Sequence, residues 1–206
     1  MDIIGLIGLG ITAFAATNID DIFLLMIFFS SARNSFSPRQ IVMGQYIGIG
    51  ALTAIGVAGS LVALVVPAHV VGLMGFVPIA IGVKRLFGLR KHTEEKDEVP
   101  KQALNSSNRA ALLSIFTVTA VTFSNGGDNI GVFVPLFASN STATDMITLV
   151  AVFMAMTAVL CTVGYYLVNH SFLASRIRRF GHLVLPFVLI GLGTYILAKG
   201  FIIPSS

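Results

Sequence analysis

Three acidic residues lie inside stretches of the chain that are otherwise apolar. Asp20 and Asp21 interrupt the first stretch and Asp128 interrupts a later one, in each case beside asparagines. A charged side chain near the centre of a bilayer costs at least about 2.5 kcal/mol, so its presence there indicates a function. Because no Lys or Arg lies within these stretches, the acids are expected to form a net-negative cavity that binds a cation. The predicted metal ligands are Asn18, Asp20, Asp21, Asn125, Asp128 and Asn129.

The two acidic segments also predict breaks in the helices that carry them. Gly126 and Gly127 disfavour a regular helix, and a break frees backbone carbonyl groups as further ligands. Successive helical residues point about 100° apart, so Asp20 and Asp21 can share one ion only where the helix is unwound. Asp20 and Asp128 are expected to form the ligand pair, with Asp21 as a third ligand or a proton carrier, and either Asp20 or Asp21 can be the principal ligand. The alternative is that the acids only stabilise packing by hydrogen bonding to the asparagines.

The ligand atoms bear on the kind of cation. Carboxylate and amide oxygens suit hard ions such as Mn²⁺ or Ca²⁺, whereas softer ions prefer sulfur. Cys161 is a candidate additional ligand, although a buried cysteine is usually a small apolar side chain. Gln45 and Tyr46 are expected to form hydrogen bonds between helices or to reach toward the interface, rather than to bind the ion.

The composition indicates a membrane protein. Of the 206 residues, 55% are hydrophobic and 11% are charged, and the mean hydropathy is +0.90. A soluble domain has about 25% charged residues, so a water-soluble globule is excluded. Cys161 is the only cysteine, which excludes a disulfide framework and redox chemistry that needs two thiols.

Long uncharged runs predict an all-α membrane protein with six transmembrane helices. A bilayer core about 30 Å thick needs roughly 20 apolar helical residues per crossing. The runs place the spans near residues 3–30, 41–66, 70–87, 111–138, 146–168 and 181–203. The polar segment between the third and fourth spans, residues 88–110, is predicted to be a cytoplasmic linker.

The basic residues predict the orientation. Of the 13 Lys and Arg residues, all but Lys199 lie between spans 1 and 2, at or between the ends of spans 3 and 4, or between spans 5 and 6. The positive-inside rule therefore places these segments in the cytoplasm and both termini outside. This distribution also explains the net charge of +4 without a nucleic-acid partner.

The two halves of the chain resemble each other. An offset of 108 residues superposes three informative pairs: Asp20 and Asp128, Gly56 and Gly164, and Pro78 and Pro186. Because each half contains three spans, the second half must enter the membrane in the opposite sense to the first. The prediction is therefore an inverted repeat of two three-helix units, residues 1–87 and 111–206.

Small residues and prolines predict how the spans pack. Gly44 and Gly48 have the spacing that allows close contact between helices. Pro78 and Pro186 are expected to bend the third and sixth spans.

These motifs resemble a known family. They are Asn18 to Asp21 followed by an apolar run, Gly44 to Gly48, Gly75 to Ile79 with Gly82 and Lys84, and Ser124 to Val132. Together they are similar, over nearly the full chain, to the cadmium-resistance transporters of the CadD type, within the lysine-exporter superfamily. The resemblance implies a multi-pass protein of the bacterial plasma membrane that exports Cd²⁺ or a related divalent cation. The cation would be the substrate and not a permanently bound cofactor.

Efflux against a gradient needs a source of energy. The chain contains no nucleotide-binding motif such as a P-loop, so proton antiport is the simplest source and H⁺ is the expected coupling ion. The expected partners are the lipid bilayer and the metal ion, with homo-oligomer formation left open.

Two other functions fit parts of the sequence. An exporter of amino acids or organic cations is the nearest alternative, but an amino-acid pocket also needs a cation or helix N-termini for the carboxylate. An intramembrane aspartyl protease would use two aspartates on separate helices to activate water. Asn125 stands where that protease pattern has a glycine, and no tyrosine precedes Asp20 or Asp21, so the protein is not expected to be an enzyme.

Overall fold

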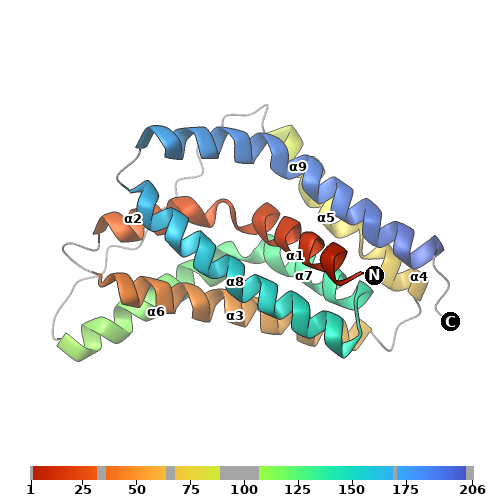
Figure 1. Ribbon diagram of the computed structural model, residues 1–206, viewed down its shortest axis with the longest axis horizontal. Coiled ribbons are helices and arrows are strands. Elements are labelled where there is room, and N and C mark those ends of the chain that lie inside the picture. Colours follow the sequence, from red (N-terminus) through yellow and green to blue (C-terminus); the bar gives the residue numbers. More distant parts are fainter. Residues whose placement is uncertain (1, 32–35, 64–67, 89–106, 169–170, 203–206) are drawn as a thin grey trace.

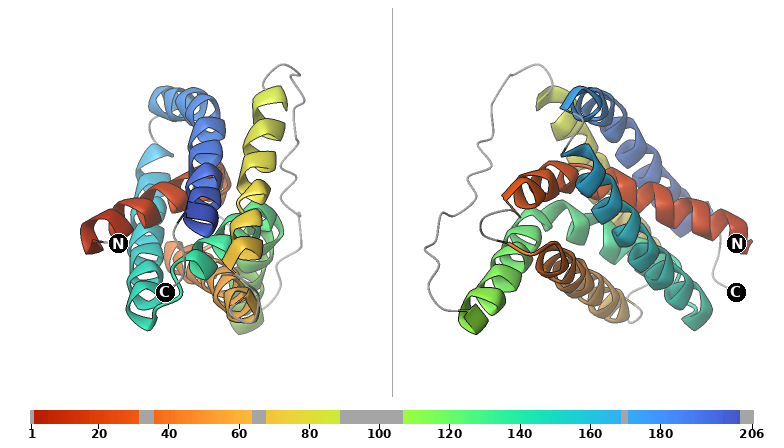
Figure 2. Two further views of the ribbon diagram at one scale, coloured as in Figure 1. Left: turned by 90° about the vertical axis from the view of Figure 1, so that its right-hand side faces the viewer. Right: turned by 60° about the vertical axis from the view of Figure 1, so that its left-hand side comes forward.

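The computed structural model describes residues 2–31, 36–63, 68–88, 107–168 and 171–202, and every regular element in this part of the chain is an α-helix. Figure 1 shows the helices arranged lengthwise in one elongated bundle. The start of helix α1 lies at the same end of the bundle as the end of helix α9, and the views in Figure 2 agree. The described part of the chain is thus all-α, as predicted.

The first predicted span is broken at its acidic segment. Helix α1, Ile3–Asn18, ends shortly before helix α2, Asp21–Ser30, begins, and the two helices are bent by 62° relative to each other. The break consists of Ile19 and Asp20. The polar residues therefore interrupt the helix where the sequence predicts.

Two long apolar helices are uninterrupted. Helix α3 is Pro38–Ala63 and helix α8 is Ala143–Leu167. By length and composition, these are the two described helices that can each cross a membrane, and the bent α1–α2 pair adds a third if it counts as one span. Shorter apolar helical stretches among the described residues are Val70–Lys84, Ala111–Asn125 and Pro186–Phe201. The predicted number of six spans stays a prediction.

The fourth predicted span is also broken. Helix α6, Ser107–Asn125, and helix α7, Gly127–Ser139, are separated by Gly126 alone. A Cβ atom at Gly126 would clash with the side chain of Leu52 on α3, whereas one at Gly127 would meet nothing within 4 Å. A larger residue at position 126 would therefore force the Leu52 side chain to shift.

The third predicted span is divided as well. It consists of the short helix α4, Ala68–Leu73, and helix α5, Phe76–Gly88, with a turn between them. The break precedes Pro78 instead of falling at it, because Pro78 occupies the first turn of α5, where its missing N–H costs little. At the turn, Gly75 lies against the backbone of Gly193, too close for a Cβ atom. The close approach of two backbones, rather than a proline, accompanies this break.

The last helix begins earlier than predicted. Helix α9 is Ser171–Ile202, whereas the uncharged run predicts a start at residue 181. The extra turns contain Arg176, Arg178 and Arg179, which favour helix, and no glycine or proline. Charge limits an apolar span but does not end a helix. Pro186 lies midway along α9, and Figure 1 shows this helix changing direction about halfway along.

Helices of one half pack mainly on helices of the other half. Helices α1 and α2 pack on α8, α6 and α7 pack on α3, and α5 packs on α9. The contact of α3 with α6 is close at Gly44 and Gly48, where an added Cβ would lie 2.6 Å from Val118 and 2.8 Å from Thr122. Thr119 Oγ1 also donates a hydrogen bond to the Gly44 carbonyl oxygen at 3.1 Å.

An aromatic cluster fills the interior between α1, α7 and α8. The ring centroid of Phe153 lies 4.4 Å from that of Phe133, 5.6 Å from that of Phe14 and 5.7 Å from that of Phe137. All four side chains are fully buried. This cluster fixes α8 against one helix from each broken pair.

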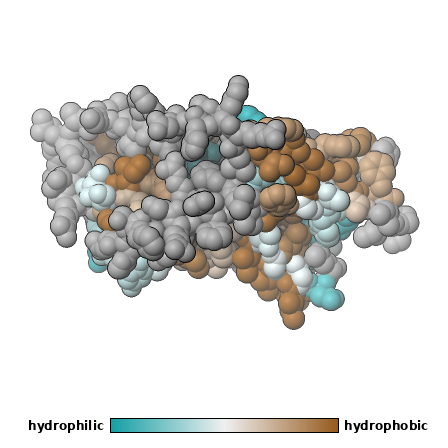
Figure 3. Space-filling model, turned by 90° about the horizontal axis from the view of Figure 1, so that it is seen from above, coloured by the Kyte–Doolittle hydropathy of each residue, from teal (hydrophilic) through white to brown (hydrophobic). Residues whose placement is uncertain are grey.

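The outer surface is apolar too. Ile4, Leu112, Phe116 and Ile147, on three different helices, are all more than half exposed. Figure 3 shows apolar residues, in brown, spread over much of the described surface on one face. A surface of this kind is suited to contact with lipid rather than with water.

Candidate functional site

The two broken helices meet, and hydrogen bonds join their breaks. At the end of α6, Asn125 Nδ2 donates to Asp21 Oδ1 at the start of α2, at 2.6 Å. At the start of α7, Asn129 Nδ2 donates to Asn18 Oδ1 at the end of α1, at 2.8 Å. The last asparagine before each break therefore contacts the first turn after the break in the other half. We call this arrangement, with Asn18, Asp21, Asn125 and Asn129 at its centre, the junction.

Asp21 is buried at the junction, with 3% of its surface exposed. Gln45 on α3 donates from Nε2 to Asp21 Oδ2 at 3.2 Å, and Thr122 on α6 donates from Oγ1 to Gln45 Oε1 at 2.7 Å. Each carboxylate oxygen of Asp21 thus accepts a hydrogen bond, Oδ2 from Gln45 on α3 and Oδ1 from Asn125 on α6. The amides solvate the carboxylate but carry no positive charge that would neutralise it.

The asparagines differ in how far their hydrogen bonds are satisfied. Asn18 Nδ2 donates to the Phe14 carbonyl oxygen at 2.9 Å and to Thr17 Oγ1 at 2.8 Å, which fixes the last turn of α1. Asn129 is buried, and no described residue donates a hydrogen bond to its Oδ1 atom. A buried acceptor without a donor costs about 1–3 kcal/mol. A cation or a water molecule beside Asn129 Oδ1 would remove this cost.

Asp20 and Asp128 flank the junction and are half-buried. Asp20 lies in the break between α1 and α2, and Asp128 lies in the first turn of α7. Of the two hydrogen bonds that join the breaks, one involves Asp21 and the other joins Asn18 to Asn129, whereas the sequence predicts Asp20 and Asp128 as the ligand pair. Among the described residues, no group of three or more His, Cys, Asp or Glu side chains could hold a metal. A metal ion at the junction would therefore use amide and backbone oxygens together with carboxylate oxygens.

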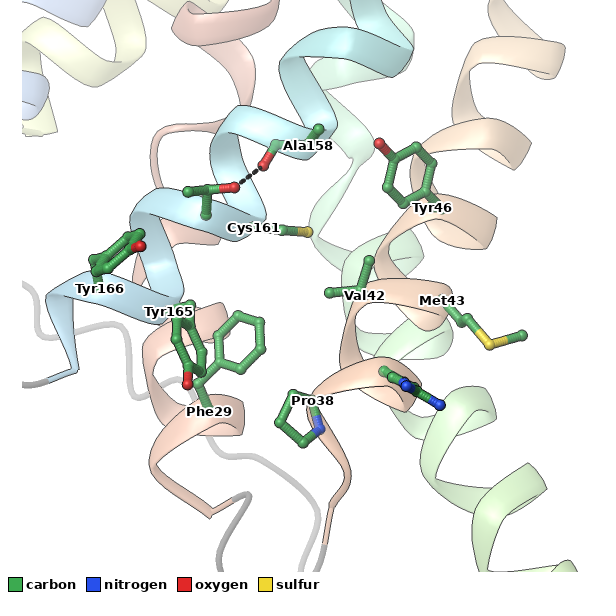
Figure 4. Close-up of a pocket in the computed structure, with 11 residues that line it drawn as sticks. Phe29, Pro38, Val42, Met43, Tyr46, Ala158, Cys161, Tyr165 and Tyr166 are labelled. Atoms are coloured by element: carbon green, nitrogen blue, oxygen red, sulfur yellow. Dashed lines mark hydrogen bonds between the residues drawn. The ribbon is translucent and has the colours of Figure 1, made fainter.

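Cys161 lies on α8 near the junction. Its side chain is buried, and α8 packs on α2, which begins at Asp21. Cys161 and Tyr46 both line a groove between α2, α3 and α8 (Figure 4). Tyr46 Oη donates a hydrogen bond to the Met154 carbonyl oxygen at 3.2 Å, which ties α3 to α8.

Two residues of this network are not among the predicted ligands. The sequence predicts that Gln45 bonds between helices, and the structure gives its partners as Asp21 and Thr122. The sequence does offer a signal for Gln45, because it is an amide side chain in an otherwise apolar stretch. Thr122 offers no such signal, because a threonine in an apolar helix usually bonds to its own helix backbone, as Thr53 and Thr157 do here.

An apolar helical bundle in which two broken helices bring buried carboxylate and amide groups together has the features of a membrane transport protein. Residues 14–203 match the family described as cadmium resistance transporter, and the chain belongs to this family. The resemblance of the sequence motifs is thereby confirmed at the level of the family. No curated protein matches the chain. No solved structure matches it either.

Membership of this family bears on the functional alternatives. The family is one of transporters associated with cadmium resistance. It gives no support to an exporter of amino acids or to an intramembrane protease.

Proposed function

We propose that the protein exports Cd²⁺ or a related divalent cation across the plasma membrane, with protons moving in the opposite direction. The observation that carries the proposal is the buried Asp21 carboxylate at the junction of two broken helices, and family membership supports it. Export lowers the cytoplasmic concentration of the cation, which accounts for resistance without any chemical change to the metal.

The burial of Asp21 supports a cation as the substrate. A buried carboxylate loses several kcal/mol of hydration free energy even after the protein relaxes. A hydrogen bond to a charged group returns about 1.5–3 kcal/mol, and the amides of Gln45 and Asn125 supply two such bonds. A cation would interact favourably with this buried charge, and Asn129 Oδ1 would offer it an oxygen from the other half.

The proposed ligands are side chains at the two breaks. Asp21 supplies the buried charge, and Cys161 adds a sulfur atom that favours a soft ion such as Cd²⁺ over Mn²⁺ or Ca²⁺. The full proposed set is Asn18, Asp20, Asp21, Asn125, Asp128 and Asn129, with Cys161 as the additional ligand.

Pairs of helix contacts support the inverted repeat. Gly56 of α3 lies against Phe133 of α7, and Gly164 of α8 lies against Leu25 of α2. At the offset of 108 residues found in the sequence, Gly56 corresponds to Gly164 and Leu25 corresponds to Phe133. The offset therefore exchanges the two contacts, so that each is the counterpart of the other. Such an exchange is expected of two similar units related by a two-fold axis.

Further contacts follow the same rule. The hydrogen bond between Tyr46 and Met154 joins two residues that are counterparts at this offset, as expected close to the axis. The exchange also relates a second pair of glycine contacts: Gly44 with Val118, and Gly10 with Val152. Two similar units that pack by exchange can rock about the shared site, which is the basis of alternating access.

One end of the bundle is proposed to face the cytoplasm. At this end α2 and α8 finish and α3, α6 and α9 begin, as Figure 1 shows. The segments that precede α3, α6 and α9 in the sequence, together with the first ten residues of these helices, contain most of the basic residues. This distribution supports the cytoplasmic placement of this end and external termini. Most of the predicted linker, residues 88–110, lies outside the described residues.

Transport into everted membrane vesicles tests the proposal directly. Vesicles that contain the protein should accumulate Cd²⁺ from a panel of divalent ions that also includes Zn²⁺, Mn²⁺ and Ca²⁺, and vesicles without the protein should not. The order of uptake across the panel identifies the preferred ion. If no divalent ion accumulates although the folded protein is present in the membrane, the proposed function is wrong.

A further inference from the structure

A groove of about 690 Å³ lies between the end of α2, the start of α3 and the second half of α8. Figure 4 shows Phe29, Val42 and Tyr165 bordering it from these three helices. The buried Cys161 is part of its lining, and so is Tyr166, which is 64% exposed. The groove therefore extends from the protein interior to the outer surface.

The lining of this groove is mainly apolar. Phe29, Pro38, Val42 and Met43 contribute carbon and thioether surface. Arg39, exposed in the first turn of α3, is the one charged side chain among the described lining residues. A divalent cation would find no carboxylate here and would be repelled by the guanidinium group. Apart from its inner end at Cys161, the groove is therefore unsuited to the proposed substrate.

We propose that the groove binds an anionic phospholipid, with an acyl chain along the apolar wall and the phosphate at Arg39. A guanidinium group matches a phosphate through paired hydrogen bonds, and the positive end of the α3 dipole lies beside it. The exposed Tyr165 and Tyr166 have amphipathic rings of the kind that are enriched at the level of lipid headgroups. An apolar hollow open to a bilayer fills with hydrocarbon rather than with water.

A lipid in the groove would brace the helices around Asp21. Tyr46 is part of the groove wall and ties α3 to α8, and its neighbour Gln45 donates to the Asp21 carboxylate. The acyl chain would fill the space between α2, α3 and α8, so it would limit their relative movement. This role adds to cation export and does not depend on which ion is carried.

Native mass spectrometry of the intact chain in detergent tests this proposal. Phosphatidylglycerol and phosphatidylcholine with the same acyl chains are offered at equal concentration. The wild-type protein should retain phosphatidylglycerol about fivefold more strongly, the factor expected for one basic side chain at an anionic headgroup. Arg39→Gln should remove this preference. Lys84→Gln, which changes another exposed basic residue, should leave it unchanged.

A second variant tests the apolar part of the groove. Val42→Trp fills the space where the acyl chain would lie, and it should lower the retention of both lipids. The melting temperature of the variant shows that the fold is kept, and Val42→Leu serves as the smaller apolar control. Equal retention of both lipids by the wild type, or full retention by a folded Val42→Trp variant, would overturn the proposal. A protein dimer that Val42→Trp dissociates would also overturn it, because a second copy would then occupy the groove.

Discussion

Asp21 and Asn129 are counterparts in the two halves but differ in charge. At the offset of 108 residues Asp21 corresponds to Asn129, and each contacts the last asparagine before the break in the opposite half, Asn125 for Asp21 and Asn18 for Asn129. One half therefore supplies a carboxylate where the other supplies an amide. In the proposed inverted repeat, the buried charge of Asp21 would therefore lie off the two-fold axis, and the two halves would hold a cation in different ways.

Replacing Asp21 by Asn keeps the shape of the side chain and removes its charge. We expect Cd²⁺ uptake by vesicles to fall at least about tenfold, the effect of losing about 1.4 kcal/mol of interaction with the ion. The melting temperature should hold or rise, because a buried charge no longer has to be desolvated. Asp2→Asn, at an exposed position before α1, is the matched control and should transport normally. Normal uptake by Asp21→Asn would remove Asp21 from the site.

Gln45 and Thr122 should act as one unit in holding Asp21. Gln45→Leu leaves a carboxylate oxygen and the Thr122 hydroxyl without their partner, and should lower the free energy of unfolding by about 1–3 kcal/mol. Thr122→Val should cost about 0.5–1.5 kcal/mol. Because the Thr122 hydroxyl acts through Gln45, the double variant should lose less free energy of unfolding than the two single variants together. The difference, which is the coupling energy, should be at least about 0.5 kcal/mol. Unfolding in detergent measures all three variants, and strictly additive losses would contradict the network.

At the scale of the helices, apolar runs predict where elements lie, whereas some of their ends depend on tertiary contacts. The interruptions of the first and fourth spans could be predicted, because polar residues and glycines weaken a helix locally. The break before Pro78 could not be predicted, since it depends on how closely Gly75 approaches Gly193 on a distant helix. The start of α9 at Ser171 was hidden for another reason: arginines mark the edge of a membrane span and also favour helix.

The close contact of α3 with α6 should be sensitive to a single methyl group. In Gly44→Ala the new Cβ would lie 2.6 Å from Val118 and 2.9 Å from the Ile115 carbonyl oxygen, and neither can move freely. Overpacking of this kind should lower the free energy of unfolding by about 1–3 kcal/mol. Gly50→Ala on the same helix meets nothing within 4 Å and should be neutral or stabilising by up to about 1 kcal/mol. Thermal unfolding in detergent compares the two, and equal stability would show that the helices do not approach this closely.

At the scale of the molecule, the end of the bundle opposite the basic segments has a polar contact within the second three-helix unit, residues 111–206. Lys199 Nζ on α9 donates to Asn140 Oδ1 at 2.7 Å, next to the end of α7. The groove lies at the other end, where α3 begins and α8 finishes. The described residues thus show a polar contact within the second unit at one end of the bundle and a groove between α2, α3 and α8 at the other.

The distribution of basic residues predicts which end faces the cytoplasm. In a Cys161→Ala background, a cysteine at Ser106, in the linker outside the described residues, should be labelled only from the cytoplasm. A cysteine at Ser141, exposed between α7 and α8, should react only from outside. A membrane-impermeant maleimide applied to intact cells and to everted vesicles distinguishes the two sides. Labelling of Ser106→Cys in intact cells would reverse the proposed topology.

Export should be driven by the proton gradient, because a divalent cation and protons compete for the same carboxylates. Bound metal favours the ionised form, so metal loading expels protons and protonation expels the metal. In everted vesicles the lumen corresponds to the cell exterior, and there protons would enter the outward-facing site, release the metal and return with the empty site to the cytoplasmic face. An acidic lumen should therefore accelerate Cd²⁺ uptake, and a protonophore should prevent its accumulation.

Asp21→Asn should abolish the metal-dependent release of protons from these vesicles as well as uptake, while Asp2→Asn should keep both. If Cd²⁺ uptake by active wild-type vesicles does not change when a proton gradient is imposed, another ion drives export.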